Sequence, residues 1–175
     1  IEAGIAPAAI AGYGDAQDRV TVKGFIIEKF VNLPELLTAA IKPGKSWKII
    51  GNEIRLNSRM DIQLLSRTQV VGNDIYHNGT AGLKGQGNHI LVKNNVIAPN
   101  TIGGFAFSFS AGARFTSTDH LVVRGNRVKH NDGPGLKTDT DHIDVLFERN
   151  RIIRNAGCGI EHEASYDAVI RNNLV

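Results

Sequence analysis

The chain has 175 residues and a formal net charge of +3, and 42% of the residues are hydrophobic while 6% are aromatic. This length and apolar content are sufficient for one domain with a sizeable core, and charges of both signs are mixed along the chain without the basic block of a nucleic-acid-binding protein. No apolar run approaches the ~18 residues of a membrane span, and the single Cys158 excludes an intramolecular disulfide.

Residues 1–19 lack a regular pattern, and we expect an irregular or partial turn there. Repeats occupy residues 20–175, so we predict a single domain over 1–175. The chain starts at Ile1 without an initiator Met or a signal-like region, and it stops at "RNNLV", within a repeat. We therefore expect it to be a piece of a longer repeat protein.

The segment "VTVKGFIIEKF" has the apolar pattern of the later repeats, but aromatic residues stand at two positions that are asparagine elsewhere. These are Phe25 and Phe30, and we expect the asparagine pattern to end here, with ring stacking in place of amide bonding. An insertion, "NLPELLTAAIKPG", follows. We expect a short helical excursion in it and then a strand from Thr38 to Ile41.

Beyond this insertion the chain repeats, and each repeat begins with two asparagines that are five residues apart. The first asparagines are Asn52, Asn73, Asn95, Asn126, Asn150 and Asn173, and the second are Asn57, Asn78, Asn100, Asn131 and Asn155. Five residues further on, after a glycine in most repeats, an apolar residue recurs: Ile62, Leu83, Phe105, Leu136 and Ile160. The regularity identifies a repeat protein.

Apolar positions within each repeat alternate with polar ones and are mostly β-branched, which predicts short strands and no helices. Asparagine and glycine tolerate left-handed backbone, so we expect them at the corners between strands. Stacked turns place equivalent side chains about 4.8 Å apart. Asparagine amides at that spacing can form two hydrogen-bonded ladders.

The "VxGNxI…N…GI" pattern resembles the right-handed parallel β-helix family, the pectin-lyase-like superfamily, over residues 20–175. The resemblance implies an all-β, single-stranded right-handed solenoid of about seven turns, each of 21–24 residues except for two longer turns. A leucine-rich repeat is the competing architecture, because "LVVRGNRV" also fits its core pattern. That repeat returns through a helical or leucine-spaced segment, whereas this chain has a second asparagine, a glycine and a strand.

Function in this family usually resides in outward side chains of the strand after the glycine corner. Alternation predicts one outward column of Lys84, Ala106, Lys137 and Glu161, and a second of Gln86, Ser108, Asp139 and Glu163. The segment "SAGARFTST", Ser110 to Thr118, lengthens one turn, and we predict a loop there that overhangs a neighbouring turn.

Similarity to polyuronate lyases of this fold implies a groove that binds an acidic polysaccharide. The candidate substrate-binding residues are Lys84, Gln86, Ser108, Arg114 and Glu161. The candidate catalytic residues are Lys137, Asp139 and His142. Lys137 would remove the proton next to the uronate carboxylate, and for this role it needs a lowered pKa.

Three carboxylates of the same face are candidate ligands of a calcium ion, a hard cation that prefers oxygen. They are Asp139, Glu161 and Glu163. In lyases of this family such a metal neutralises the uronate carboxylate. The alternative is that Lys–Glu pairs on adjacent strands only stabilise an exposed sheet.

Histidines form a second constellation, because His89, His120 and His142 are predicted at the same corner of three consecutive turns. Asp119 and Asp141 precede the latter two. An Asp–His pair can act as a general base, and a His/Asp cluster can bind a transition metal. A third interpretation is that these residue types simply suit the corner.

Two functions remain open. The first is a carbohydrate-active module that binds or cleaves an acidic polysaccharide, with lyase-, epimerase- or hydrolase-like chemistry. The second is a non-catalytic scaffold, such as a surface, adhesin-like or tailspike-like segment or a periplasmic metal-delivery domain. The resemblance implies an extracellular or periplasmic location. Exposed terminal turns predict self-association, and nothing predicts a nucleic-acid or membrane partner.

Overall fold

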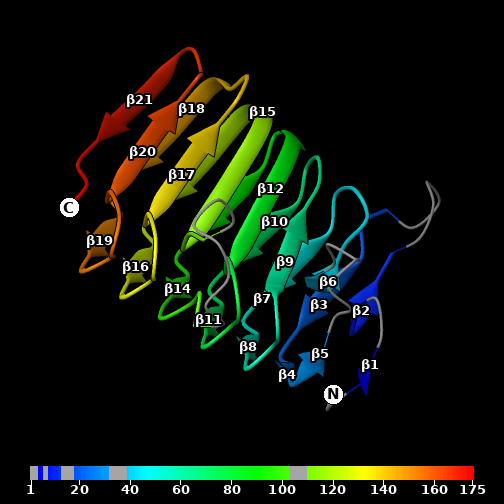
Figure 1. Ribbon diagram of the computed structural model, residues 1–175. Coiled ribbons are helices and arrows are strands. Elements are labelled where there is room, and N and C mark those ends of the chain that lie inside the picture. The colour runs from blue at the N-terminus through cyan, green and yellow to red at the C-terminus, as the bar shows by residue number, and fades with distance from the viewer. Residues whose placement is uncertain (1–3, 6–7, 13–17, 32–38, 103–109) are drawn as a thin grey trace.

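The computed structural model describes residues 4–5, 8–12, 18–31, 39–102 and 110–175. These residues form parallel strands stacked along one axis, from the blue N-terminal end to the red C-terminal end in Figure 1. About six turns of a right-handed parallel β-helix result, against the seven expected. Within the described residues each turn returns through further parallel strands and no helix occurs, which contradicts the leucine-rich-repeat alternative. Among them, no helix is long and apolar enough to cross a membrane.

Each turn contributes a strand to three stacks. The strands of the first arm follow the glycine corner: β2 (Ile10–Ala11), β6 (Ala39–Lys42), β9 (Met60–Leu64), β12 (Leu83–Asn88), β15 (Ala113–Arg124), β17 (Leu136–Asp139) and β20 (Ile160–Glu163). The second arm comprises β3 (Thr21–Lys23), β7 (Lys48–Ile50), β10 (Gln69–Val71), β13 (Leu91–Lys93), the end of β15, β18 (Ile143–Glu148) and β21 (Ala168–Arg171). The long β15 joins the two arms into one 13-stranded sheet.

The third stack is a separate six-stranded sheet. It comprises β4 (Ile26–Glu28), β8 (Glu53–Arg55), β11 (Asp74–Tyr76), β14 (Val96–Ile97), β16 (Arg127–Lys129) and β19 (Arg151–Ile153). A small parallel pair, β1 (Gly4–Ile5) with β5 (Phe30–Val31), lies at the N-terminal end. The strand expected from Thr38 to Ile41 is β6, and residues 32–38, where we expected a helical excursion, lie outside the described part.

The core lies between the three stacks, where apolar side chains of the strands point inward. Ile49, Val70, Val92, Val123 and Phe147 form one fully buried column, as the repeat predicted. At the C-terminal end the column continues into Ile170, which is 49% exposed. Apolar side chains thus remain accessible at this end, and self-association through it stays a prediction.

Both asparagine ladders are present. In the first, Asn73 donates from Nδ2 to Asn95 Oδ1 (3.0 Å) and to the Ile49 carbonyl (2.9 Å). The same Asn95 Oδ1 accepts the backbone N–H of Asn73 at 2.9 Å. Each side chain therefore bonds both the preceding turn and the next turn, and the second ladder repeats the bonds to the next turn from Asn57 to Asn155.

The corners differ in detail from the prediction. Except at Asn100, which follows Pro99, the residue before each ladder asparagine adopts the left-handed conformation, such as Gly72 (φ 65°) before Asn73 and His77 (φ 56°) before Asn78. The ladders end as predicted at Phe25 and Phe30, but through backbone bonds instead of ring stacking. The Phe25 N–H donates to Asn52 Oδ1 at 3.0 Å, and the Phe30 N–H donates to Asn57 Oδ1 at 3.1 Å.

We predict that Asn95→Ala lowers the free energy of unfolding by about 3 kcal/mol or more, because it leaves several buried backbone and amide groups without partners. Urea denaturation followed by circular dichroism measures the change. Asn88→Ala is the matched control, since Asn88 is exposed on β12, and it should cost less than about 1 kcal/mol. Equal losses in the two variants would contradict a structural role for the ladder.

Candidate functional site

The outward face of the first arm carries a column of polar side chains in consecutive turns. Strand register pairs Gln63 with Lys84, Lys84 with Arg114, Arg114 with Lys137, and Lys137 with Glu161. Adjacent members are therefore about one strand spacing, ~4.8 Å, apart. The sequence predicted this column correctly except for one member, because Arg114 stands where Ala106 was expected.

The incorrect assignment of Ala106 to this column arises from the long turn between Asn95 and Asn126. Counting a fixed distance from Asn100 selected Phe105 as the start of the strand, but Ala113 pairs with both Leu83 and Leu136. The extra residues therefore precede the strand, and Ala113 to Thr118 belong to β15 instead of a loop. Arg114 thus reaches the face from a strand. Ala106 and Ser108 lie outside the described residues, and Thr116 takes the position predicted for Ser108, beside Asp139.

Lys137 is held between two carboxylates. Its Nζ donates to Glu161 Oε1 at 2.6 Å and to Glu163 Oε2 at 2.7 Å. Partial burial alone would lower the pKa of Lys137, but the hydrogen bonds and negative charges of the two glutamates outweigh burial and raise that pKa. This direction is opposite to what a general base requires, because a raised pKa keeps the amine protonated.

Asp139 is also paired, because Arg114 Nη2 donates to its Oδ2 at 2.5 Å. Burial alone would raise the pKa of Asp139, but the hydrogen bonds from Arg114 and Thr140 and the charges of Arg114 and Lys137 together outweigh burial and lower that pKa. In this arrangement Arg114 pairs with Asp139, and Lys137 pairs with Glu161 and Glu163. The described residues contain no metal-binding group of three His, Cys, Asp or Glu. Calcium at this face stays a prediction.

Lys84 differs from the other cations of the column. It makes no ion pair or hydrogen bond within the described part of the chain, and it is partly buried between Gln63 and Arg114. Burial, together with the positive charge of Arg114, lowers the pKa of Lys84. The lowered pKa that was predicted for Lys137 is therefore found at Lys84, two strands away.

A depression of about 360 Å³ adjoins this face and is lined by Lys45, Leu65, Ser66, Gln86, Gly87 and Ser117. Gln86 enters it because the register between β12 and β15 shifts between Gly85 and Gly87, and Gly87 adopts φ 102°. The sequence therefore correctly predicted Gln86 on the outward face of the first arm. The bulge, however, removes Gln86 from the column of Asp139 and Glu163.

His142 is not at the corner predicted for it. The register aligns Asp119 with Ile143, so Asp144 is the residue that follows His89 and His120 at that corner. The backbone of His89, His120 and Asp144 is left-handed, with φ of 58°, 56° and 54° respectively. His142 is fully buried, its Nδ1 lies 2.6 Å from Thr118 Oγ1, and burial lowers its pKa. A buried ring cannot touch a polymer on the outward face, so the predicted catalytic role lacks the necessary access.

The corner itself forms an exposed group. The His89 and His120 rings lie 4.6 Å apart, and His120 contacts Asp119 (2.6 Å) and Asp144 (3.3 Å) through its two nitrogens. Asp141, predicted to pair with His142, has no such contact with it among the described interactions. The carboxylates therefore orient one imidazole.

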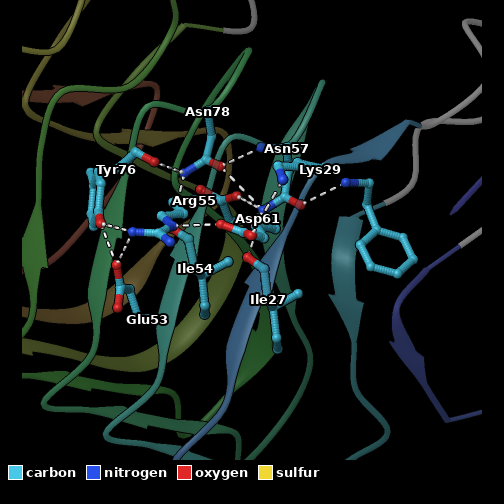
Figure 2. Close-up of polar contacts among 11 residues, drawn as sticks. Ile27, Lys29, Glu53, Ile54, Arg55, Asn57, Asp61, Tyr76 and Asn78 are labelled. Atoms are coloured by element: carbon cyan, nitrogen blue, oxygen red, sulfur yellow. Dashed lines mark hydrogen bonds and ion pairs between the residues drawn. The ribbon is translucent and has the colours of Figure 1, made fainter. Parts of the chain in front are cut away.

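Sequence reasoning missed Asp61. This residue occupies the position of the corner glycines, because Ile62 pairs with Leu83 and Gly82 precedes Leu83. A side chain at Gly82 would meet the amide of Asn100, but at Asp61 the carboxyl instead accepts from Asn57 Nδ2 at 3.1 Å, as Figure 2 shows. Its Oδ2 is buried without a partner. The signal in the sequence was an acidic residue at a corner that is glycine in the later repeats.

Comparisons with known proteins point to the fold. A family model described as a right handed beta helix region matches residues 39–175. No curated protein and no solved structure matches the chain significantly.

We predict that Asp61 makes stability depend on pH. Burial raises the pKa of Asp61 well above its usual 3.8, so the folded chain holds this proton more tightly than the unfolded chain does. The stabilising contribution is complete below pH ~4 and is lost as the pH rises toward the folded pKa. Asp61→Asn should remove this loss, so that its thermal midpoint exceeds that of the natural chain at pH 8.

The control is Asp74→Asn, which changes an exposed aspartate on β11. It should leave the pH profile of the thermal midpoint unchanged. A profile that is the same for the natural chain and for Asp61→Asn between pH 4 and 8 would show that Asp61 is ionised in the fold.

Proposed function

The chain belongs to the right-handed β-helix family, and from this premise we propose that it binds an acidic polysaccharide along the outward face of β9, β12, β15, β17 and β20. A polymer laid across these strands would meet the cations of successive turns at a spacing of about 4.8 Å. The adjoining depression supplies polar groups from Gln86 and Ser66. This arrangement suits a chain of carboxylated sugars.

The observation that carries the proposal is that Lys84 has no ion-pair partner in the part of the chain that the structure describes. An ion pair on the same surface must be broken before its lysine can bind a substrate carboxylate, as at Lys137. Lys84 can bind a carboxylate without first breaking an ion pair, and Arg114 beside it adds a second positive charge. Uronate carboxylates are therefore attracted to this end of the column.

In its neutral form the same residue suits the chemistry of a uronate lyase, and the positive charge of Arg114 beside it then remains to attract the carboxylate. In that reaction a base removes the proton next to the carboxyl group, a carbon–carbon double bond forms, the glycosidic bond breaks, and the departing oxygen becomes a hydroxyl by taking a proton from water. A lysine with a lowered pKa is more often neutral and can accept this proton. We therefore assign the role of base to Lys84 and not to Lys137, whose ammonium form is stabilised by two glutamates.

A non-catalytic scaffold is the second candidate. It is favoured by the ion pairs Lys137–Glu161, Lys137–Glu163 and Arg114–Asp139, which neutralise much of the face. Such pairs on adjacent strands stabilise a sheet modestly without any ligand. Under this hypothesis the face should not discriminate between acidic and neutral polysaccharides.

We predict that Lys84→Ala weakens binding of uronate oligosaccharides by about tenfold, because it removes a charge-assisted hydrogen bond. Calorimetric titration with pectate, alginate and glycosaminoglycan fragments measures the affinity. Ultraviolet absorbance of the unsaturated uronate product measures cleavage in the same samples. If Lys84 is the base, Lys84→Ala abolishes the absorbance rise while Lys137→Ala only reduces it.

Lys93→Ala is the matched control, since Lys93 is an exposed lysine on β13 in the second arm. It should bind as the natural chain does. Binding without an absorbance rise would support a binding module without lyase activity. No binding to any acidic polymer by the folded chain would refute the proposal and leave the scaffold.

A further inference from the structure

The outward face of the six-stranded sheet divides into two electrostatically different halves. In the N-terminal half, Arg55 donates from Nε to Glu28 (2.7 Å) and from Nη1 to Glu53 (2.7 Å) and Tyr76 (3.1 Å). Figure 2 shows Glu53, Arg55 and Tyr76 in this network. The cation of this half is therefore matched by carboxylates on the same or the neighbouring strand.

In the C-terminal half, cations gather without such partners. Arg127 of β16 pairs in register with Arg151 of β19, and Lys129 lies two residues beyond Arg127 on the same side of its strand. Together with Ile153, these three side chains line a surface depression of about 420 Å³. The two strands are neighbours in Figure 1.

The neighbouring strands supply no negative charge. Arg127 pairs on its other side with Val96, Lys129 pairs with Ile153, and Arg151 pairs with Leu174. Within the described residues, none of the three cations forms an ion pair, in contrast to Arg55 and Lys137. The nearest carboxylate in the Arg127 column is Asp74, two strands away across Val96, at roughly 10 Å.

Like charges in register on adjacent strands repel each other, and this cost falls when an anion lies between them. We propose that Arg127, Lys129 and Arg151 form a binding site for a tetrahedral oxyanion, a sulfate or phosphate group. Three donors around one depression match an anion with three or four oxygens better than a carboxylate with two. Guanidinium groups bind such oxygens in pairs, and a dianion balances more of the charge.

This site is separate from the polysaccharide face, because it lies on the six-stranded sheet and not on the first arm. It also selects a different chemistry, an ester of sulfate or phosphate instead of a uronate carboxylate. The inference therefore holds or fails independently of the proposed function.

The test is a titration of the full chain, labelled with nitrogen-15, with sodium sulfate, sodium phosphate or sodium acetate at constant ionic strength. We expect saturable shifts of the Arg127, Lys129 and Arg151 amides with sulfate or phosphate, and at least about tenfold weaker binding of acetate. The tighter of sulfate and phosphate identifies the ester that the site takes. The double variant Arg127→Ala with Arg151→Ala should lose these shifts.

Two further variants separate a built site from general attraction. Lys48→Ala with Lys93→Ala removes the same charge from the second arm and should leave the affinity within about twofold. Arg127→Lys with Arg151→Lys keeps the charge but not the paired donors, and should bind several-fold more weakly. Equal binding of acetate, an equal loss in the control pair, or no saturable shift at these amides would overturn the proposal.

Discussion

The structure depends on one constraint, the stacking of equivalent residues about 4.8 Å apart in consecutive turns. Every strand hydrogen-bonds only to the strands of the turns before and after it. No turn can therefore shift without breaking its backbone hydrogen bonds to both neighbouring turns. The asparagines add a further restriction. Asn95 Oδ1, for example, accepts both the side-chain and backbone donors of Asn73, which fixes the register of those two turns to a single residue.

The same stacking gives an outward surface made of columns, and a column accommodates charges in one of two ways. Where a cation and carboxylates alternate, as at Lys137 and Glu161, they pair and the surface is neutral. Where cations follow each other, as at Arg127 and Arg151, the repulsion is inherent in the register. Ligand-binding sites are therefore expected where a column does not alternate cations with carboxylates. Such places are found by aligning the turns.

The sequence predicted the fold because the ladder asparagines and core residues repeat at nearly constant intervals. It predicted the candidate face only in part. Within regular turns, as at Lys137, Glu161 and Glu163, alternation was sufficient. In the long turn it failed, because a fixed offset cannot say whether extra residues lie before or after the strand. Arg114 consequently replaced Ala106. Asp144 replaced His142 for a different reason, because Asp144 is the residue that stands six positions before its asparagine, as His89 and His120 do.

The protonation states could not be predicted from position alone. Lys84 and Lys137 occupy the same column and the same place in their repeats, yet their pKa values shift in opposite directions. The difference comes from their neighbours, since Lys137 has Glu161 beside it, whereas Lys84 has Gln63 and Arg114. The protonation state of a residue in a solenoid is therefore set by the turns on either side of it. A catalytic base is expected where a lysine has no carboxylate beside it in either neighbouring turn.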